Sequence, residues 1–391
     1  MDIFNDNLSP MEKTIYCERY VNNGSPSGFT FINTTSIGTR SFDAVKSVKI
    51  PVIKLRSTDQ LSYFGSNTVS INADQLIIHP DMLDSIVTDS HIDDITFVEA
   101  IPMASNRTVF IPQFNKYIKL QYDKLIGRIE RIISLNHIYH SMAVNKILHS
   151  LRWNNTHFHF FPEEHARIYS QDNGHTIGMI VREADVSPNT CGVVVPAFSL
   201  FSVDKNNAQD KSLLLQLIDR TSLDKNEFIL SKFIQPAISL YFKILLETGL
   251  HIEAHAQNIC YIISDSNVEI AFRDFESMDK DLEIATKYNS YFNVKYKCFN
   301  KRCQDYAKRH SFMFDFKLGE YLITPILNEA MKAGCDDKYM IDKIKEFVNN
   351  FIPLLPNDYF PRNHWYAFPK KLIDRTSSDR PYVENDAPKY R

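Results

Sequence analysis

The feature that most constrains the fold is an apolar stretch at residues 227–248, in which hydrophobic residues recur at helical spacing. One face would carry Phe233, Ile234, Ala237, Ile238, Tyr241, Ile244 and Leu245. A period of 3.6 residues indicates a helix that packs one side against a core. Gly249 follows directly, and glycine commonly ends helices because it adopts the left-handed backbone conformation without steric cost. We therefore expect a long buried helix that ends at this glycine.

A β-hairpin is predicted next in the chain. Two short apolar segments, 259–263 and 268–272, are joined by a polar turn at 264–267, which is the pattern of paired strands. A hairpin brings the residue before its first strand close to the residue after its second. Asn258 and Asp274 should therefore lie side by side.

This pair of residues suits a magnesium site. An Asn and an Asp offer hard oxygen ligands, and Mg²⁺ bound in this way usually also holds substrate phosphates; protein kinases use the same pairing. Glu253 and His255 lie in the loop just before the hairpin. The alternative is that Asp274 is a turn residue, Asn258 a local cap and His255 a core histidine. Their joint occurrence favours the metal and phosphate site.

A second polar cluster lies upstream and consists of Ser105, Arg107, Thr108, Lys119 and Arg131. The three cations follow one another at intervals of twelve residues. We expect the first two on a hairpin at 107–121, with its turn at 115–116, and the third near the start of a helix at 122–153. Cations placed in this way could converge on a polyphosphate, which Arg contacts through a fork and Lys as a point charge. The alternative is a solvated surface.

The remaining patterns predict a mixed α/β fold. They indicate loops around a short strand at 22–39, strands at 47–56 and 74–80, strands at 157–161 and 175–183 paired through a turn at 172–174, an exposed polar loop at 204–212, and a mostly helical region at 278–391 that is broken at 353–362.

Composition excludes some functional classes. The 391 residues carry a net charge of −3, which argues against a general nucleic-acid binder. The sequence has no run of about 18 apolar residues, so we expect no membrane span, and its N-terminus does not have the pattern of a signal peptide. Six cysteines without a C-x-x-C pair predict reduced thiols in a cytoplasmic protein.

The two polar clusters together resemble the NRPS-independent siderophore synthetases of the aerobactin-synthetase type. That family's pattern is Ser-x-Arg-Thr, a Lys and an Arg, followed later by Glu-x-His-x-Gln-Asn and an Arg-Asp pair. The matching positions are Ser105–Thr108, Lys119, Arg131, Glu253–Asn258 and Arg273–Asp274. The resemblance covers roughly residues 70–391, and the ordered set of motifs is fairly specific.

Two further segments extend the resemblance, and one family element is missing. His79-Pro80 stands where the family has His-Pro-Trp-Gln, although Asp81-Met82 replace the last two residues, and the segment WYAFPKKLIDR at 365–375 resembles the family's closing helix. The early His-Pro-x-His-Pro element of the family, used to bind the carboxylate substrate, has no match. The resemblance therefore implies an N-terminally shortened member in which citrate is an uncertain substrate.

The resemblance implies a fold of fingers and palm with a kinase-like catalytic hairpin. The expected divisions are a reduced thumb-like region at 1–104, β-rich fingers at 105–225 and a mostly helical palm at 226–391. The implied activity is that of an ATP-dependent ligase with ATP and Mg²⁺ as cofactors. Such an enzyme adenylates a carboxylic acid, which would be citrate-like, another polycarboxylate or an amino acid. It releases pyrophosphate, then joins the acid to an amine or hydroxyl with AMP as the second product.

The resemblance also implies residue roles. The catalytic residues would be Arg107, Lys119, Arg131 and His255. ATP would contact Ser105, Thr108, Lys119, Arg131, Arg182, His255, Asn258 and Asp274. Mg²⁺ would be held by Glu253, Asn258 and Asp274. The substrate carboxylate would contact Ser105, Arg107 and His79.

Two other functions stay open. A kinase-like phosphotransferase fits the Asn/Asp hairpin, although no Asp base precedes Asn258, where His255 and Gln257 stand instead. A non-catalytic or partner subunit of a synthetase would fit the shortened N-terminus. In each case we expect small-molecule ligands and a possible homodimer or partner subunit, without nucleic acid or membrane.

Overall fold

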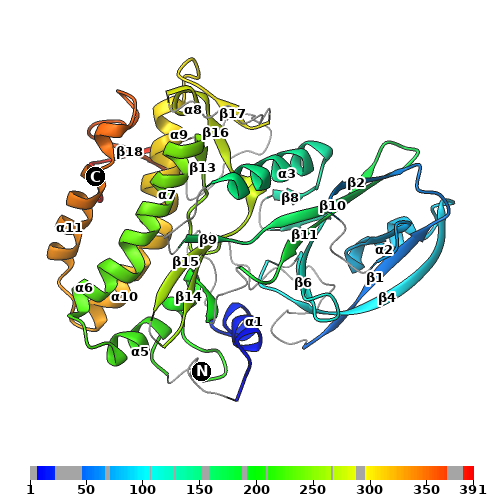
Figure 1. Cartoon of the computed structure of the whole chain (residues 1–391), viewed down its shortest axis with the longest axis horizontal. Coiled ribbons are helices and arrows are strands. Elements are labelled where there is room, and N and C mark those ends of the chain that lie inside the picture. The colour runs from blue at the N-terminus through cyan, green and yellow to red at the C-terminus, as the bar shows by residue number, and fades with distance from the viewer. Residues whose placement is uncertain are drawn as a thin grey trace.

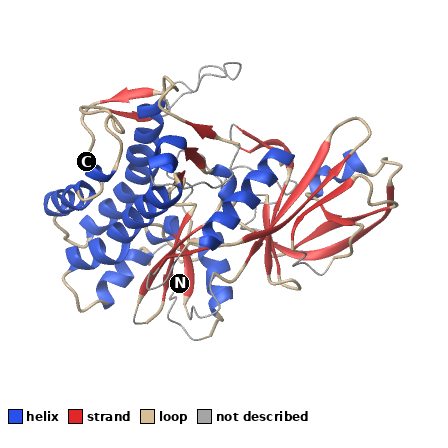
Figure 2. Cartoon of the chain, turned by 45° about the horizontal axis from the view of Figure 1, so that its top comes forward, coloured by secondary structure: helices blue, strands red, loops and turns tan. Residues whose placement is uncertain are grey.

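The structure is a computed structural model, and it describes residues 7–22, 46–66, 71–105, 107–126, 129–151, 158–186, 192–207, 210–265, 267–287, 296–367 and 382–391. A β-rich part and a helical part lie side by side, with a small sheet between them (Figure 1). Figure 2 shows the same separation from a second direction, with most of the helices on one side and the strands of the large sheet on the other. The mixed α/β class predicted from the sequence is confirmed.

The β-rich part is built on an eight-stranded sheet in the order β2-β10-β11-β6-β5-β4-β1-β3. Its strands are β1 (Val48–Leu55), β2 (Leu61–Gly65), β3 (Gln75–Ile77), β4 (Ile92–Pro102), β5 (Thr108–Ile111), β6 (Lys116–Leu120), β10 (Glu163–Ser170) and β11 (Thr176–Glu183). The segments η1 (Pro80–Met82) and α2 (Leu83–Ile86) follow β3. The sheet joins strands from both sides of residue 104, and the proposed domain boundaries stay a prediction.

Alternation along the strands buries both faces of the middle of this sheet. On β11, Ile180 packs beneath α3 (Leu135–Ser150) with Ala166 and Ile168, whereas Met179 and Val181 belong to the core on the opposite face. Successive side chains of a strand point to opposite faces, so a strand covered on both sides is apolar along its length. This explains the buried run in β11.

The sequence interpretation was right for the β5–β6 hairpin and wrong for one strand partner. Ile111 pairs with Lys116, and Asn115 in the turn has a φ of 51°. The segment 175–183 was expected to pair with 157–161, but β11 pairs with β10 instead, through the predicted turn. Pro162 interrupts the apolar run. The strand before it, β9 (Phe158–Phe160), leaves the large sheet and pairs in parallel with β15 (Val268–Phe272).

The helix predicted at 122–153 begins later than expected. The strands β7 (Tyr122–Ile126) and β8 (Ile129–Arg131) form a hairpin, and α3 follows them. Ser134 is the N-cap: its side chain accepts from the backbone N–H of His137, and serine is among the preferred N-cap residues. The apolar spacing at 125–133 fitted a helix as well as a hairpin, so the cap decides where the helix starts. Arg131 is therefore placed by a strand.

The long buried helix is confirmed. It runs without a break through α6 (Lys225–Ile229), the π-helical η2 (Leu230–Ile234) and α7 (Gln235–Thr248), and Gly249 ends it with a φ of 74°. This helix is long and apolar enough to cross a membrane by composition alone, with a mean hydropathy of 1.4. Its buried residues form the centre of the core of the helical part, as a core helix does.

The predicted hairpin is also confirmed, as β14 (Ile259–Ile263) and β15. It belongs to a four-stranded sheet with β9 and β12 (Val193–Pro196), and α1 (Pro10–Tyr20) packs against β12. The other elements of this half are α4 (Ala197–Leu200), α5 (Leu213–Arg220), β13 (Leu250–His251), η3 (Phe275–Ser277), β16 (Asp279–Asp281), α8 (Leu282–Lys287), β17 (Cys298–Phe299), α9 (Tyr306–Ser311), the π-helical η4 (Phe312–Ile323), α10 (Thr324–Lys332), α11 (Asp337–Asn349), η5 (Ile352–Leu354), β18 (Trp365–Ala367) and β19 (Val383–Asn385).

Three smaller expectations have different outcomes. The closing helix expected at 365–375 is not formed at its start, where β18 pairs with β19, and residues 368–381 lie outside the described residues. Of the loops expected at 22–39, residues 23–39 also lie outside them. The polar loop at 204–212 is not wholly exposed, because Asp204 is buried and accepts a hydrogen bond from the Tyr16 hydroxyl at 3.0 Å.

Candidate active site

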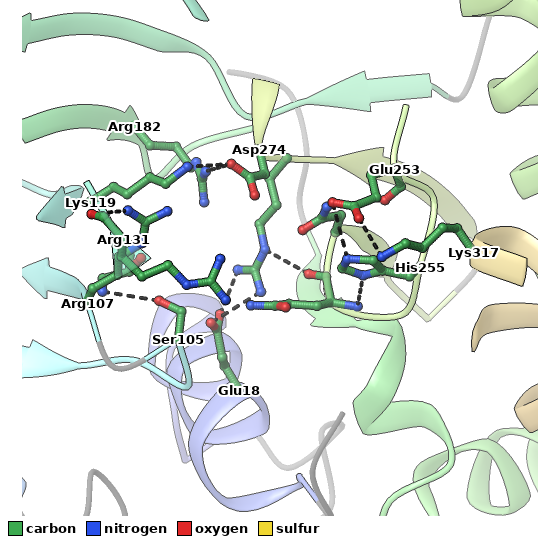
Figure 3. Close-up of a pocket in the computed structure, with 14 residues that line it drawn as sticks. Glu18, Ser105, Arg107, Lys119, Arg131, Arg182, Glu253, His255, Asp274 and Lys317 are labelled. Carbon is green, nitrogen blue, oxygen red and sulfur yellow. Dashed lines mark hydrogen bonds and ion pairs between the residues drawn. The ribbon is translucent and has the colours of Figure 1, made fainter. Parts of the chain in front are cut away.

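One pocket lies between the large sheet and the β14–β15 hairpin, and it brings together every predicted site residue except His79 (Figure 3). The predicted residues that line it are Ser105, Arg107, Thr108, Lys119, Arg131, Arg182, Glu253, His255, Asn258 and Asp274. The pocket also contains side chains that were not assigned a role from the sequence, namely Glu18, Gln257, Arg273 and Lys317.

The hairpin places Asn258 and Asp274 as its geometry predicts. Ile259 pairs with Phe272, and the Arg273 N–H donates to the Asn258 carbonyl oxygen at 3.0 Å, which continues the ladder to the open end. Asp274 has a φ of 81° and a ψ of 75°, a left-handed conformation that costs a residue other than glycine about 1–3 kcal/mol. Such strain is often found at functional sites, and here it directs the Asp274 carboxylate toward the pocket (Figure 3).

Lys119 joins two carboxylates on the sheet side of the pocket. Its Nζ lies 2.6 Å from Asp274 Oδ1 and 2.8 Å from Glu276 Oε2. Burial raises the pKa of both acids, but the nearby cations, Lys119 first, outweigh it. The pKa of Glu276 falls to about 2 and that of Asp274 falls well below its usual range. Both acids are therefore charged at neutral pH.

The other cations of this side are fixed by different partners. Arg182 donates from Nη2 to Glu163 Oε1 at 2.6 Å and lies 4.0 Å from Asp274 Oδ1. Arg107 donates to the Arg131 carbonyl oxygen at 3.0 Å. The Arg131 side chain has no carboxylate partner among the described residues, so its charge is available to an anion in the pocket.

The opposite side of the pocket carries Glu253, His255 and Lys317. Lys317 Nζ lies 2.5 Å from Glu253 Oε1, and His255 Nε2 lies 3.6 Å from Glu253 Oε2. Burial raises the pKa of Glu253, but Lys317 and His255 hold it well below its usual range. The Gln257 N–H donates to His255 Nδ1 at 3.2 Å, which leaves Nε2 to carry the ring proton toward Glu253.

A buried ion pair connects α1 to the hairpin. The Arg273 guanidinium donates to the Glu18 carboxylate at 2.8 and 3.2 Å, and its Nε donates to the Gln257 carbonyl oxygen at 3.0 Å. Glu18 and Arg273 are far apart in the sequence, and no motif around Glu18 announces the contact. The sequence gives no signal for the contact of Lys317 either, because this lysine lies within the apolar π-helical segment η4.

His79 does not line the pocket. It is fully buried, its Nδ1 accepts from the Asp81 N–H at 3.1 Å to cap η1, and its ring packs on Tyr122 with centroids 4.5 Å apart. The sequence resemblance had assigned it to the substrate carboxylate, whereas its position is that of a structural histidine in the large-sheet part.

Comparisons with known proteins agree with the resemblance. No protein-family model matches the chain. A curated protein, L-2,3-diaminopropanoate–citrate ligase from Staphylococcus aureus (strain NCTC 8325 / PS 47), is 26% identical over 207 residues, which are 49% of this chain and 35% of that protein. The match thus spans about a third of the relative's length.

Solved structures match over much more of the chain. The petrobactin biosynthesis protein AsbB from Bacillus anthracis str. Sterne has a TM-score of 0.72 at 14% identity, over 99% of this chain and 76% of that one. ATP-bound aerobactin synthetase IucA from a hypervirulent pathotype of Klebsiella pneumoniae has a TM-score of 0.69 at 13% identity, over 88% and 70%. The chain has the aerobactin-synthetase fold. Aerobactin synthetase IucC from the same source matches with a TM-score of 0.70 at 13% identity, over 90% and 73%.

Within the aerobactin-synthetase fold, the pocket places cations beside oxygen ligands. The cations are Arg107, Lys119, Arg131 and Arg182, and the oxygen ligands are those of Glu253, Asn258 and Asp274, on the hairpin and the loop before it. Cations suit phosphate oxygens, and ionised carboxylates beside an amide oxygen suit a hard divalent cation. The arrangement can therefore hold a metal–polyphosphate complex between the two parts.

Proposed function

We propose that this protein is an ATP-dependent ligase that activates a carboxylic acid as an acyl-adenylate and joins it to an amine or hydroxyl, as in siderophore biosynthesis. The observation that carries the proposal is the meeting of the phosphate-type cations and the Asn258/Asp274 pair in one pocket, in a fold whose neighbours include an ATP-bound aerobactin synthetase. The name of the curated relative supports a citrate-like acid and an amino-acid amine as substrate classes.

Arg107, Lys119 and Arg131 would carry the activation step. A carboxylate oxygen attacks the α-phosphorus of ATP, the bond to the β-phosphate oxygen breaks, and pyrophosphate leaves with the electron pair. Negative charge builds up on the phosphate oxygens as this happens, and fixed cations in a water-poor pocket stabilise it more than water does. Ser105 and Thr108 stand beside these cations and would hydrogen-bond the α-phosphate or the substrate carboxylate.

The second step transfers the acyl group. The amine or hydroxyl attacks the acyl carbon, the bond to the AMP oxygen breaks, and the nucleophile loses a proton. His255 Nε2, which lies 3.6 Å from Glu253 Oε2, would turn its proton from Glu253 to the leaving phosphate. Arg131, without a carboxylate partner among the described residues, would hold the AMP phosphate.

The donor set fits Mg²⁺. Asp274 and Glu253 are both ionised at neutral pH because their pKa values are lowered. Asn258 donates through its Nδ2 to the Glu253 carbonyl oxygen, which leaves the amide oxygen as an acceptor. These three residues would hold the ion, and Mg²⁺ would neutralise charge on the phosphates.

A kinase-like phosphotransferase is the second candidate, favoured only by the Asn/Asp hairpin. Product analysis separates the two. The protein is incubated with ATP, Mg²⁺, a panel of di- and tricarboxylates and hydroxylamine as a general trap, and the nucleotides are resolved by chromatography. AMP and pyrophosphate with one acid would support the ligase and give its substrate class. ADP would turn the assignment to a kinase.

A matched pair of variants makes this test sharper. Asp274→Asn keeps the size of the side chain and removes a charge from the pocket, so AMP formation is expected to fall at least about a hundredfold, within the range that catalytic electrostatic groups contribute. Asp93→Asn removes a charge from an exposed ion pair with Lys54 and is expected to leave the rate unchanged. ATP bound without turnover would support a partner subunit. The homodimer and the cytoplasmic location stay predictions.

A further inference from the structure

A second cluster of ligand-type side chains is buried inside the helical part. It contains His251 at the end of β13, Asp281 at the end of β16 and His310 on α9, three elements that lie next to one another near the top of Figure 1. All three side chains have no exposed surface, and one ligand atom from each lies within 4.8 Å of the others. None of them lines the pocket of the proposed active site.

Two of these side chains are oriented by outer partners. Tyr241 Oη lies 3.0 Å from His251 Nδ1, so this nitrogen can carry the proton, and Nε2, which has the Tyr359 hydroxyl at 3.3 Å, can offer its electron pair. The backbone N–H groups of Glu283 and Ile284 donate to Asp281 Oδ1 at 2.8 and 3.4 Å. Its other oxygen, Oδ2, accepts from the Tyr306 hydroxyl at 2.8 Å and lies 3.2 Å from His310 Nε2. Metal-binding histidines and carboxylates are characteristically held by such outer hydrogen bonds.

His310 supplies the observation that a purely structural network does not explain. Neither of its ring nitrogens has a hydrogen-bond partner among the described residues, although Nε2 lies 3.2 Å from Asp281 Oδ2. A buried polar group without a partner is rare, and one cause is an ion that is not represented.

We propose that His251 Nε2, His310 Nε2 and Asp281 Oδ2 bind a structural Zn²⁺ ion. The Tyr359 hydroxyl, 3.3 Å from His251 Nε2, is the fourth neighbour. Two imidazoles and one carboxylate are ligands that Zn²⁺ accepts in tetrahedral geometry. Mg²⁺ and Ca²⁺ prefer all-oxygen sets, and complete burial leaves no open position for a substrate, so the site is structural.

The position of the cluster indicates which segments the ion would hold together. His251 is two residues before Glu253, and Asp281 follows the catalytic hairpin and η3. Zn²⁺ would therefore fasten the loop before the hairpin and the strand after it to α9. This proposal does not rest on the ligase assignment, and each can fail without the other.

The test is the metal content of the full-length protein, purified without chelator from cells grown with zinc and measured by inductively coupled plasma mass spectrometry. We expect about one Zn²⁺ per chain, as for a closed structural site. His310→Gln is expected to lose it, whereas His165→Gln is expected to keep it, because His165 is another buried histidine outside the cluster. Asp274→Asn serves as a second control, since zinc held in the active-site pocket would be lost from that variant instead.

A stability measurement covers the case in which His310→Gln does not fold. Wild-type protein is stripped with dipicolinate, and its melting temperature is recorded with and without ZnCl₂. A rise on adding zinc, reversed by the chelator, supports the site, because an ion that binds only the folded state stabilises it. Wild-type protein that carries no zinc and melts unchanged in ZnCl₂ would overturn the proposal, as would equal zinc in His310→Gln and wild type.

Discussion

The buried pair between Glu18 and Arg273 allows a sharp test of how the β14–β15 hairpin is held. Glu18→Gln keeps the shape of the side chain but removes its charge. The Arg273 guanidinium would then be left in a buried position with one neutral acceptor in place of a carboxylate that it contacts at 2.8 and 3.2 Å. Breaking a buried ion pair on one side is expensive because the remaining charge stays desolvated.

The size of the expected change in the free energy of unfolding follows from the burial of the pair. The side chains of Glu18 and Arg273 are 4% and 11% exposed, so we expect the free energy of unfolding to fall by about 3 kcal/mol, at the lower end for such changes because Gln keeps one hydrogen bond. Arg273 directly precedes Asp274, and its loosening should also weaken Mg·ATP binding by about tenfold, since small displacements in a site have large effects. Urea denaturation and isothermal titration measure the two effects.

The control is an ion pair of similar length at the surface. Lys54 Nζ and Asp93 Oδ2 are 2.7 Å apart, but their side chains are 41% and 44% exposed. Asp93→Asn is therefore expected to leave the free energy of unfolding unchanged within error. Equal effects of Glu18→Gln and Asp93→Asn would refute the reasoning, because they would mean that distance, and not burial, decides the contribution.

Other predictions concern the helix end, acid stability and the sheet side of the pocket. Gly249→Ala should lower the free energy of unfolding by at least about 2 kcal/mol, because alanine disfavours a positive φ and its Cβ would lie 2.7 Å from the Asp281 carbonyl oxygen; an unchanged urea midpoint contradicts this. Glu276 has a pKa of about 2 when folded, below its unfolded value, so it contributes stability above about pH 4.3 that disappears as the pH falls toward 2. Glu276→Gln should flatten the acid limb of the stability curve, and parallel curves would show that the pair with Lys119 contributes nothing. Arg182→Lys should weaken Mg·ATP binding, because lysine is not a substitute at a forked contact; titration calorimetry that gives wild-type affinity would remove Arg182 from the site.

Local patterns were sufficient where several signals agreed. The helix that ends at Gly249 and the β14–β15 hairpin were predicted because helical period, cap and turn residues all agreed, and the hairpin then fixed the neighbourhood of Asn258 and Asp274. The upstream cations reached the same pocket although Arg131 was expected on a helix and lies on a strand. The motif spacing was thus more informative than the local structure assigned to it.

The failures have a common physical cause, which is long-range pairing. The local sequence does not show that the strand at 175–183 pairs with β10 and not with the apolar residues before Pro162. The contacts of Glu18 and Lys317 with the pocket are likewise made across the chain, by α1 and by η4. His79 was misplaced for a different reason: a two-residue motif match carries no information about which way its side chain faces.

The double contact of Lys119 has a consequence for the order in which ligands arrive. Its ammonium contacts Asp274 and Glu276 at 2.6 and 2.8 Å, so a bare divalent cation would meet a competitor of like charge at the same carboxylates. A cation that arrives with a nucleotide brings new anionic oxygens to which the lysine can turn. Under the proposed function, binding of the nucleotide complex would exchange the partners of Lys119. The pocket would then bind a divalent cation together with the nucleotide more readily than the cation alone.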